Sequence, residues 1–376
     1  MAMTNFGRLL ENSQLAWGRK VWRAARNSSF ILKHFTGESE QSVVQRITEL
    51  TETAKGTTAA VFTLVPDLEG DGVVGDNQLE GNEEELKAYD QTITYDQIRN
   101  ANRLEGRMAD MKSTVRFREN SMNVLKNWLA QRMDEMAFLV LSGVSLQYKT
   151  NGALRVGSQF PMLDWAGDIT APTANRHFRW DATDGMEAAG TNLIAAADLP
   201  TWEMVIQAKA FAEEHYIRPV STTDGIEVYT LFLHPRQIAA LKNDPRFIEA
   251  MKFARERGQS NTLFKGTGMG GTASGIYIDG VNIVSYRNVF NTTGAPSGSK
   301  WGAAGDVDGA RALLVGAQAL AIADIGVPKW VEKDFDYDNS PGISVAKLIG
   351  FKKPVWRSAY TGTMEDFSVV AIDTAI

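Results

Sequence analysis

Cysteine is absent from the 376 residues, and histidine occurs only four times. The lack of cysteine excludes disulfide bonds, thiolate zinc sites and cysteine nucleophiles. The histidines are His34, His177, His215 and His234, and none lies four residues from another, as a metal-binding helix motif would require. The sequence therefore predicts no metal, no cofactor and no catalytic residue.

Long apolar runs are also missing. Nowhere do about 18 consecutive apolar residues occur, so no membrane-spanning helix is predicted. The first residues lack the apolar core of a secretory signal peptide. We therefore expect a protein that is made and kept in a cytoplasm, with no membrane partner.

What the chain does contain is ample core material. Hydrophobic residues make up 44% and charged residues 22% of the sequence, which is typical of a folded chain with one large or two medium cores. The formal net charge of −6 argues against general nucleic-acid binding.

The charge is unevenly distributed. Residues 1–46 carry seven basic residues against three acidic ones, whereas residues 67–90 carry nine acidic residues against Lys87. The two segments are either two solvated surfaces or a pair that binds between neighbouring copies.

The first 35 residues read as a broken amphipathic arm. Trp17, Val21, Trp22 and Ala25 follow helical spacing between basic residues. Such a helix could lie on a membrane or in a partner's groove, but its aromatic residues favour docking on another subunit equally well.

A long acidic loop separates two β-rich segments, 56–66 and 91–98. Loops of this length are unusual inside compact domains, so we expect a β-arm that reaches outside the domain. A stripe of apolar residues then predicts one helix over 108–142, about 50 Å long at ~1.5 Å per residue.

The remaining chain reads as an irregular excursion followed by a second folded unit. Residues 149–200 are rich in Gly, Pro, Asp and Thr, which predicts little regular structure. Beyond Thr201, a predicted N-cap, the expected elements are helix 202–216, strand 226–233, a helix from His234 to Arg257 kinked at Pro245, and strands 276–286, 312–325, 343–350 and 367–373.

Two glycine patterns resemble nucleotide-binding loops but lack their context. Gly70, Gly72 and Gly75 are surrounded by carboxylates, which would repel a pyrophosphate. The second pattern, 266–271, follows a helix and precedes a strand, the reverse of the required order. No enzymatic activity is therefore predicted.

Several segments in order along the chain carry a family resemblance. They are Trp17…Trp22-x-x-Ala25-Arg26-x-x-Ser29-Phe30, Gln45-x-Ile47-x-Glu49-Leu50, the run Leu68–Glu84, Asp96-Gln97-x-Arg99-Asn100-Ala101, and Asn261–Gly266 with Gly275-Ile-Tyr-Ile. This series resembles the major capsid proteins of N4-like tailed bacteriophages, which have the Hong Kong 97-type fold. The resemblance spans residues 17 to 325, and Leu68–Glu84 is its most specific part.

The resemblance implies an α+β fold in five parts. These are an N-terminal arm (1–55), an extended hairpin called the E-loop (56–100), a peripheral domain with the spine helix 108–142 (101–200), an axial domain (201–325) and a return to the peripheral domain (326–376).

It also implies a role and partners. The chain would assemble with other copies of itself into pentamers and hexamers that form an icosahedral or prolate shell around double-stranded DNA, without binding that DNA specifically. The short arm favours a separate scaffolding protein; a portal and decoration proteins are further expected partners. The protein would be assembled in the bacterial cytoplasm and end in the virion.

The contact residues follow from the same assignment. In the E-loop they are Asp67, Glu69, Gly70, Asp71, Gly72, Gly75, Asp76, Glu80, Gly81 and Glu84. In the N-terminal arm they are Trp17, Arg19, Trp22, Arg23 and Arg26. The alternatives are an encapsulin-like compartment shell, which shares the fold, and a homo-oligomeric enzyme or sugar-binding protein that uses residues 201–325.

Overall fold

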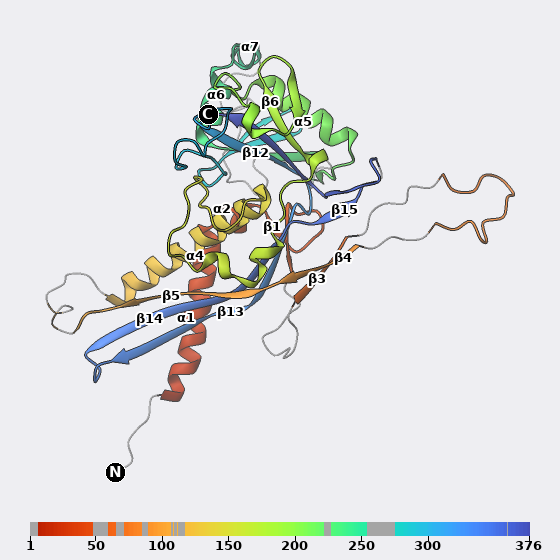
Figure 1. Ribbon diagram of the computed structural model, residues 1–376. Coiled ribbons are helices and arrows are strands. Elements are labelled where there is room, and N and C mark those ends of the chain that lie inside the picture. The colour runs from red at the N-terminus through yellow and green to blue at the C-terminus, as the bar shows by residue number, and fades with distance from the viewer. Residues whose placement is uncertain are drawn as a thin grey trace.

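The computed structural model describes residues 7–47, 59–64, 71–84, 89–106, 108, 111, 117–221, 227–253, 275–358 and 360–376. These residues form two large sheets that share one continuous apolar core, a small hairpin of β15 (Val355–Arg357) and β16 (Met364–Asp366), and a hairpin arm that projects to one side (Figure 1). Phe138, from the helix that covers one large sheet, and Phe232, from a strand of the other, pack edge to face with ring centroids 5.3 Å apart. The predicted α+β fold class is therefore present.

The first sheet is elongated and built around two long antiparallel strands. Its strand order is β1 (Thr36–Gly37), β2 (Val44–Ile47), β13 (Leu320–Phe335), β14 (Ser340–Lys352) and β5 (Asp96–Arg103). The strand β2 pairs parallel with β13, so residues close to the N-terminus complete a sheet made mostly by the C-terminal part.

Two helices cover this sheet. Helix α4 (Phe117–Ser142) lies along the sheet against β14, and helix α1 (Gly7–Ser28) crosses it in contact with both α4 and β13 (Figure 1). A short helix, α2 (Phe30–His34), then turns the chain into β1. In α4 the residues from Met133 onward are all buried, because the elongated sheet, the arm helices and the second sheet surround that end.

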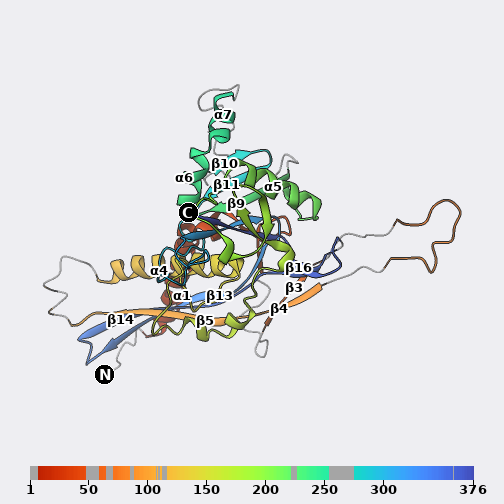
Figure 2. The same ribbon diagram turned by 45° about the horizontal axis from the view of Figure 1, so that its top comes forward.

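The second sheet has eight strands. Its path is β10 (Gly275–Ile278), β11 (Val281–Ser285), β9 (Glu227–Leu233), β12 (Gly309–Val315), β17 (Val369–Ala375), β6 (His177–Asp181) and β7 (Gly185–Ala188), with β8 (Val220–Ser221) paired to β9. Helices α5 (Trp202–Glu214), α6 (Pro235–Asn243) and α7 (Pro245–Phe253) lie on this unit, at the top of Figure 1. Figure 2 shows α7 at the end farthest from the elongated sheet.

The predicted single strand 312–325 is wrong, because the chain changes sheets within it. Strand β12 ends at Val315 in the eight-stranded sheet, and β13 begins at Leu320 in the elongated sheet. Gln318 between them has φ of 55°, a left-handed conformation that turns the backbone. The turn is buried like the strands, so no exposed polar break marks it in the sequence.

Sheet membership also differs from the expected division of the chain at two places. Strands β6 and β7 lie within the expected peripheral segment 101–200, yet they join the eight-stranded sheet. Strand β17 lies in the expected return segment 326–376, and it pairs with β12 and β6 in that same sheet. The end of the chain is thus a central strand of the second unit.

The helix boundaries of the second unit show two local mechanisms. Thr201 occupies the N-cap position of α5, but its side chain makes no capping bond; the N–H of Trp202 instead donates to Asp244 at 2.6 Å. The predicted kink is a complete break, since α6 ends at Asn243 and α7 starts at Pro245. The last predicted helical residues, 254–257, lie outside the described residues.

His234 is the N-cap of α6, where the sequence predicted that a helix begins. Its Nδ1 accepts a hydrogen bond from the N–H of Arg236 at 3.3 Å, and the side chain of Gln237 accepts from the N–H of His234 at 2.7 Å. Burial, aided by the charge of Arg236, lowers the pKa of His234, which keeps the ring neutral and able to accept.

The predicted helix 108–142 is described from Phe117 to Ser142. Met108 and Met111 are described separately and are 65% and 83% exposed, so they belong to no core of this subunit. Residues 112–116 lie outside the described residues.

Candidate inter-subunit surfaces

The acidic segment lies at the end of a two-stranded arm. Strands β3 (Ala59–Leu64) and β4 (Tyr89–Thr94) pair antiparallel from Ala59 opposite Thr94 to Leu64 opposite Tyr89. The hairpin that the sequence predicted is therefore present, and it leads away from both sheets (Figures 1 and 2).

The root of the arm is firmly held by the body. Ala60, Leu64 and Ile93 pack into a small buried cluster with Trp356 and Phe367. At Gly350 a Cβ atom would lie 2.2 Å from the carbonyl oxygen of Thr94, so only glycine lets β14 approach β4 this closely. Strands β3 and β4 are therefore fixed to the body at the root of the arm.

The described tip, residues 71–84, is shaped by its own turns. The N–H of Asn82 donates to the carbonyl of Leu79 at 2.9 Å, which closes a β-turn. Gly81, at the third position of that turn, has φ of 92°, a conformation that favours glycine. Side chains of Asn77 and Asn82 donate to the carbonyls of Val74 and Gln78 at 2.7 and 2.9 Å. The tip is preformed by local bonds.

Almost every side chain of the tip is exposed, including the apolar Val74 (77%) and Leu79 (59%). Five carboxylates lie in residues 71–84 and no basic residue does. The predicted E-loop residues located here are Asp71, Gly72, Gly75, Asp76, Glu80, Gly81 and Glu84. The remaining three, Asp67, Glu69 and Gly70, lie outside the described residues.

The apolar face of helix α1 differs from the expectation of an inter-subunit contact. Val21, Trp22 and Ala25 are buried in this subunit's own core. At Gly18 a Cβ atom would lie 2.3 Å from the carbonyl oxygen of Pro328, so the helix sits directly on β13. Burying an apolar side chain of this size stabilises by roughly 1.5–3 kcal/mol, which favours docking within the subunit.

The polar face of α1 keeps its exposed cations. Arg19 and Arg23 are exposed, whereas Trp17 is half-buried and stacks on Trp330 at 6.3 Å. Arg118 also lies over Trp17, 4.9 Å from the centroid of its ring. Of the five predicted arm residues, Arg19 and Arg23 are therefore the exposed ones.

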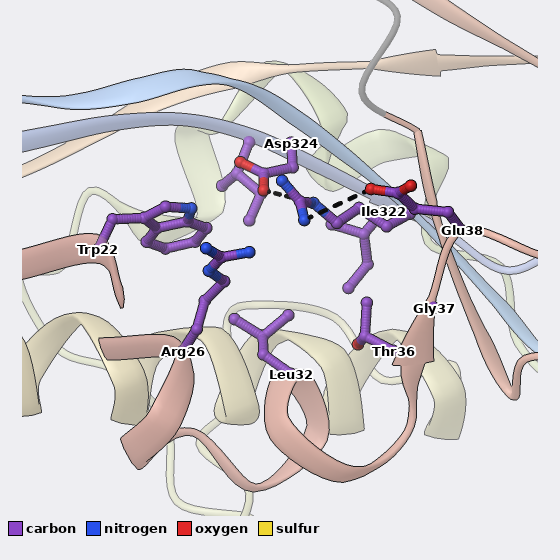
Figure 3. A pocket seen from close by; sticks show the side chains of 10 residues that line it. Trp22, Arg26, Leu32, Thr36, Gly37, Glu38, Ile322 and Asp324 are labelled. Carbon is purple, nitrogen blue, oxygen red and sulfur yellow. Dashed lines mark hydrogen bonds and ion pairs between the residues drawn. The ribbon is translucent and has the colours of Figure 1, made fainter. Parts of the chain in front are cut away.

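The fifth of these residues, Arg26, faces a pocket of about 330 Å³ between the arm helices and the elongated sheet (Figure 3). Trp22, Leu32 and Ile322 form apolar walls. Asp324 is already paired, since Arg46 Nε lies 2.8 Å from it and Lys347 also forms an ion pair with it.

A buried carboxylate joins three parts of the subunit. Asp134 of α4 accepts hydrogen bonds from the hydroxyls of Ser29 and Tyr286, both at 2.6 Å, and from the N–H groups of Phe30 and Ile31 at 3.0 and 3.1 Å. Burial, together with the charge of Asp134, raises the pKa of Tyr286, so its hydroxyl stays protonated and donates. The start of α2, helix α4 and the segment after β11 thus converge on one side chain.

Buried ion pairs also hold the C-terminal strand in the second sheet. Arg311 Nε donates to Asp373 at 2.7 Å, and His177 Nε2 lies 2.8 Å from the same carboxylate. Burial alone would raise the pKa of Asp373, but Arg311 and His177 outweigh it and hold the pKa below its usual range. Adjacent to β17, Lys353 pairs with Asp366 at 2.8 Å.

Among the described residues no group of three or more His, Asp or Glu could hold a metal ion. The histidines are dispersed: His177 binds Asp373, His215 bonds the carbonyl of Phe211, His234 caps α6, and His34 lies against Phe30. No helix in the described part of the chain is long and apolar enough to cross a membrane.

The sequence missed two of these features. Asp134 lies within the stripe of apolar residues that predicted the long helix. A carboxylate on the buried face of that helix was the sequence signal that could have identified it. The pocket beside Arg26 forms where α1 packs on β13. Because these two elements lie about 300 residues apart in the chain, no local sequence pattern predicts it.

Comparisons with known proteins agree with this arrangement. The chain is 50% identical to the major capsid protein of Pseudomonas phage KPP25 over 375 residues, covering 99% of this chain and 97% of that one. Its fold matches the capsid of Ralstonia phage GP4 with a TM-score of 0.71 and 27% identity, over 92% and 91% of the two chains. It also matches the capsid of cyanophage Pam1 with a TM-score of 0.65 and 18% identity, over 91% and 90%.

The predicted capsid fold is confirmed by these structures. Residues 9–376 match the phage capsid protein family, a family of structural proteins. With the match spanning nearly the whole sequence, the chain belongs to the phage capsid protein family.

Proposed function

We propose that this chain is the major capsid protein of a tailed phage and that its copies assemble into pentamers and hexamers. These capsomers would close an icosahedral or prolate shell around double-stranded DNA. The anchored, outward-reaching arm carries the proposal. The bonds of Asn77, Gly81 and Asn82 form its turns from within the tip itself, and the tip exposes Val74 and Leu79. Such a surface suits a neighbour.

The arm tip and the polar face of α1 are the proposed contact surfaces. The described E-loop residues of the tip and the exposed Arg19 and Arg23 would face neighbouring copies. We extend this to the finer assignment that the fold is of the Hong Kong 97 type, as in N4-like phages, with the arm as the E-loop and α4 as the spine helix.

The physics of closure favours many modest contacts. A head-to-tail interface that closes by rotation gives rings, which then tile a shell. Because each arm adds a contact to a subunit already held by others, later contacts form at high effective concentration. Each single contact can therefore be weak while the closed particle is stable.

The remaining partners are proposed on chemical grounds. A net charge of −6 suits a container whose wall binds DNA phosphates weakly, since a strongly basic lining would retain the DNA. A separate scaffolding protein, a portal and decoration proteins complete the expected set, with assembly in the bacterial cytoplasm.

The test replaces residues 71–84 by a short Gly-Ser linker and keeps β3 and β4. Because the tip contributes no contact to its own core, the subunit should keep its circular dichroism spectrum and melting temperature. Closed particles should be lost in electron micrographs, since each capsomer contact loses its arm.

The matched control permutes residues 71–84 at constant length and composition. This control keeps the charge of the tip but loses the Leu79–Asn82 turn. It therefore separates the effect of the tip's shape on assembly from the effect of its charge. Abundant closed particles from the linker variant would contradict the assignment of this arm as the contact element.

A further inference from the structure

Two arginines and two carboxylates line the pocket beside helix α1, and both carboxylates lie against Arg46. Arg46 pairs with Asp324 at 2.8 Å and lies 3.9 Å from Glu38, and Lys347 also binds Asp324. Arg26 rests 5.8 Å from the centre of the Trp22 ring. Both carboxylates of the lining are therefore taken by Arg46, and neither pairs with Arg26.

Arg26 has no acidic partner in the part of the chain that the structure describes. Its Nε is buried without an acceptor. A buried guanidinium nitrogen without a hydrogen bond costs on the order of 1–3 kcal/mol, so a carboxylate that reaches it would be bound favourably. In Figure 3 the side chain points from α1 toward Trp22, at the edge of an apolar space bounded by Leu32 and Ile322.

The arm tip offers the complementary chemistry. Leu79 is 59% exposed, and Glu80 follows it at the second position of the turn that ends at Asn82. One apolar side chain and one carboxylate thus project from the same short, preformed turn. Both residues lie far from the body of their own subunit, because the arm leads away from it (Figures 1 and 2).

We infer that Leu79 and Glu80 of one copy occupy the Arg26 pocket of a neighbouring copy. The inference rests on the proposed shell assembly and adds the destination of the arm. Leu79 fills the space between the apolar walls, and Glu80 pairs with Arg26. A preformed turn loses little conformational entropy on docking, which favours the contact.

The absence of cysteine makes a direct test simple. The double variant Leu79→Cys with Thr36→Cys places one thiol on the turn and one on the pocket wall. A disulfide forms only when the two Cα atoms come within roughly 4.4–6.8 Å. Assembled particles of this variant should give covalent multimers on non-reducing gels, and each single variant should not.

The matched control pairs Leu79→Cys with Leu193→Cys. Leu193 lies in the second unit and is as exposed (60%) as Leu79 (59%). Particles that form but show no bond between positions 79 and 36, or that bond 79 to 193 instead, would overturn the inference and leave the shell assignment intact. A chain that forms no particles even without substitutions would overturn the shell assignment itself.

A charge exchange provides the second readout. Arg26→Glu and Glu80→Arg should each lower the particle yield by about tenfold or more, because a small loss per contact is repeated around every ring. The combined variant should recover to within about threefold of the unsubstituted chain, since the ion pair is restored with reversed sign. If the combined variant is no better than the worse single variant, the pairing is wrong.

Should the cysteine pair prevent assembly, Arg26→Lys replaces it. The introduced amine can be coupled to Glu80 by a carbodiimide in assembled particles, and the joined peptide identified by mass spectrometry. Coupling of position 26 only to other carboxylates would count against the inference.

Discussion

Asp134 shows how one side chain can organise several elements. Its two oxygens receive four donors, and two of these are the N–H groups at the start of α2. A carboxylate at a helix start satisfies amides that have no partner within the helix. Here the carboxylate comes from another helix, so the cap also fixes the start of α2 against α4.

Replacing Asp134 by Ala should lower the free energy of unfolding by about 3–5 kcal/mol, because it leaves buried donors unsatisfied. Tyr286→Phe, which removes one donor and keeps the ring stacked on Phe30, should cost only about 1 kcal/mol. Urea denaturation of unassembled subunits measures both. Equal losses for the two variants would show that the carboxylate is not the organising group.

Asp373 makes the fold sensitive to acid. Its folded pKa lies below the unfolded value of about 3.9, so its contribution is present above that pH and is lost as the pH falls through the folded pKa. The free energy of unfolding of unassembled subunits should therefore decrease below about pH 4.

In Asp373→Asn this part of the pH dependence should be missing, although the variant should be less stable at pH 7 because Arg311 loses its charged partner. Denaturation measured at several pH values between about 2 and 7 checks the slope. An unchanged slope below about pH 4 would assign the acid sensitivity to other carboxylates.

At the scale of elements, the docking of α1 depends on Gly18. A Cβ at this position would lie 2.3 Å from a backbone oxygen of β13, and a backbone atom cannot move aside cheaply. Gly18→Ala should therefore lower the free energy of unfolding by about 1–3 kcal/mol, although alanine favours helix formation. Gly167, where an added Cβ would meet no atom within 4 Å, is the matched control, and Gly167→Ala should stay within about 0.5 kcal/mol. A stabilised Gly18→Ala chain would contradict the tight packing of α1 on β13.

Sequence patterns correctly predicted the elements that are determined by residues close together in the chain. The arm hairpin, the cap at His234 and the amphipathic α1 all follow from residues close in sequence. The change of sheet after Val315 could not be predicted this way, because strands buried on both faces and the turn between them form one buried, mostly apolar run.

The sequence also could not show which surface the apolar face of α1 packs against. Trp22 follows helical spacing whether it binds its own subunit or another, and only the long-range packing within the core decides between them. The pocket beside Arg26 and the four bonds to Asp134 depend on the same long-range packing. Sequence patterns therefore located the exposed arm better than the interior that positions it.

At the scale of the whole molecule, the subunit combines a well-packed body with a reaching arm. Its two large sheets share a continuous core, buried ion pairs hold the last strand in the second sheet, and a small apolar cluster anchors the root of the arm. This distribution of order suits assembly, because a stiff body fixes the angle between neighbours while an exposed tip completes the contact.

The most direct test of this account is electron microscopy of the full chain, produced in bacteria alone and together with a candidate scaffolding protein. The account predicts closed shells built from hexameric and pentameric capsomers, with density for each arm on a neighbouring subunit. A chain that stays monomeric or dimeric under both conditions, with no larger species, would contradict it.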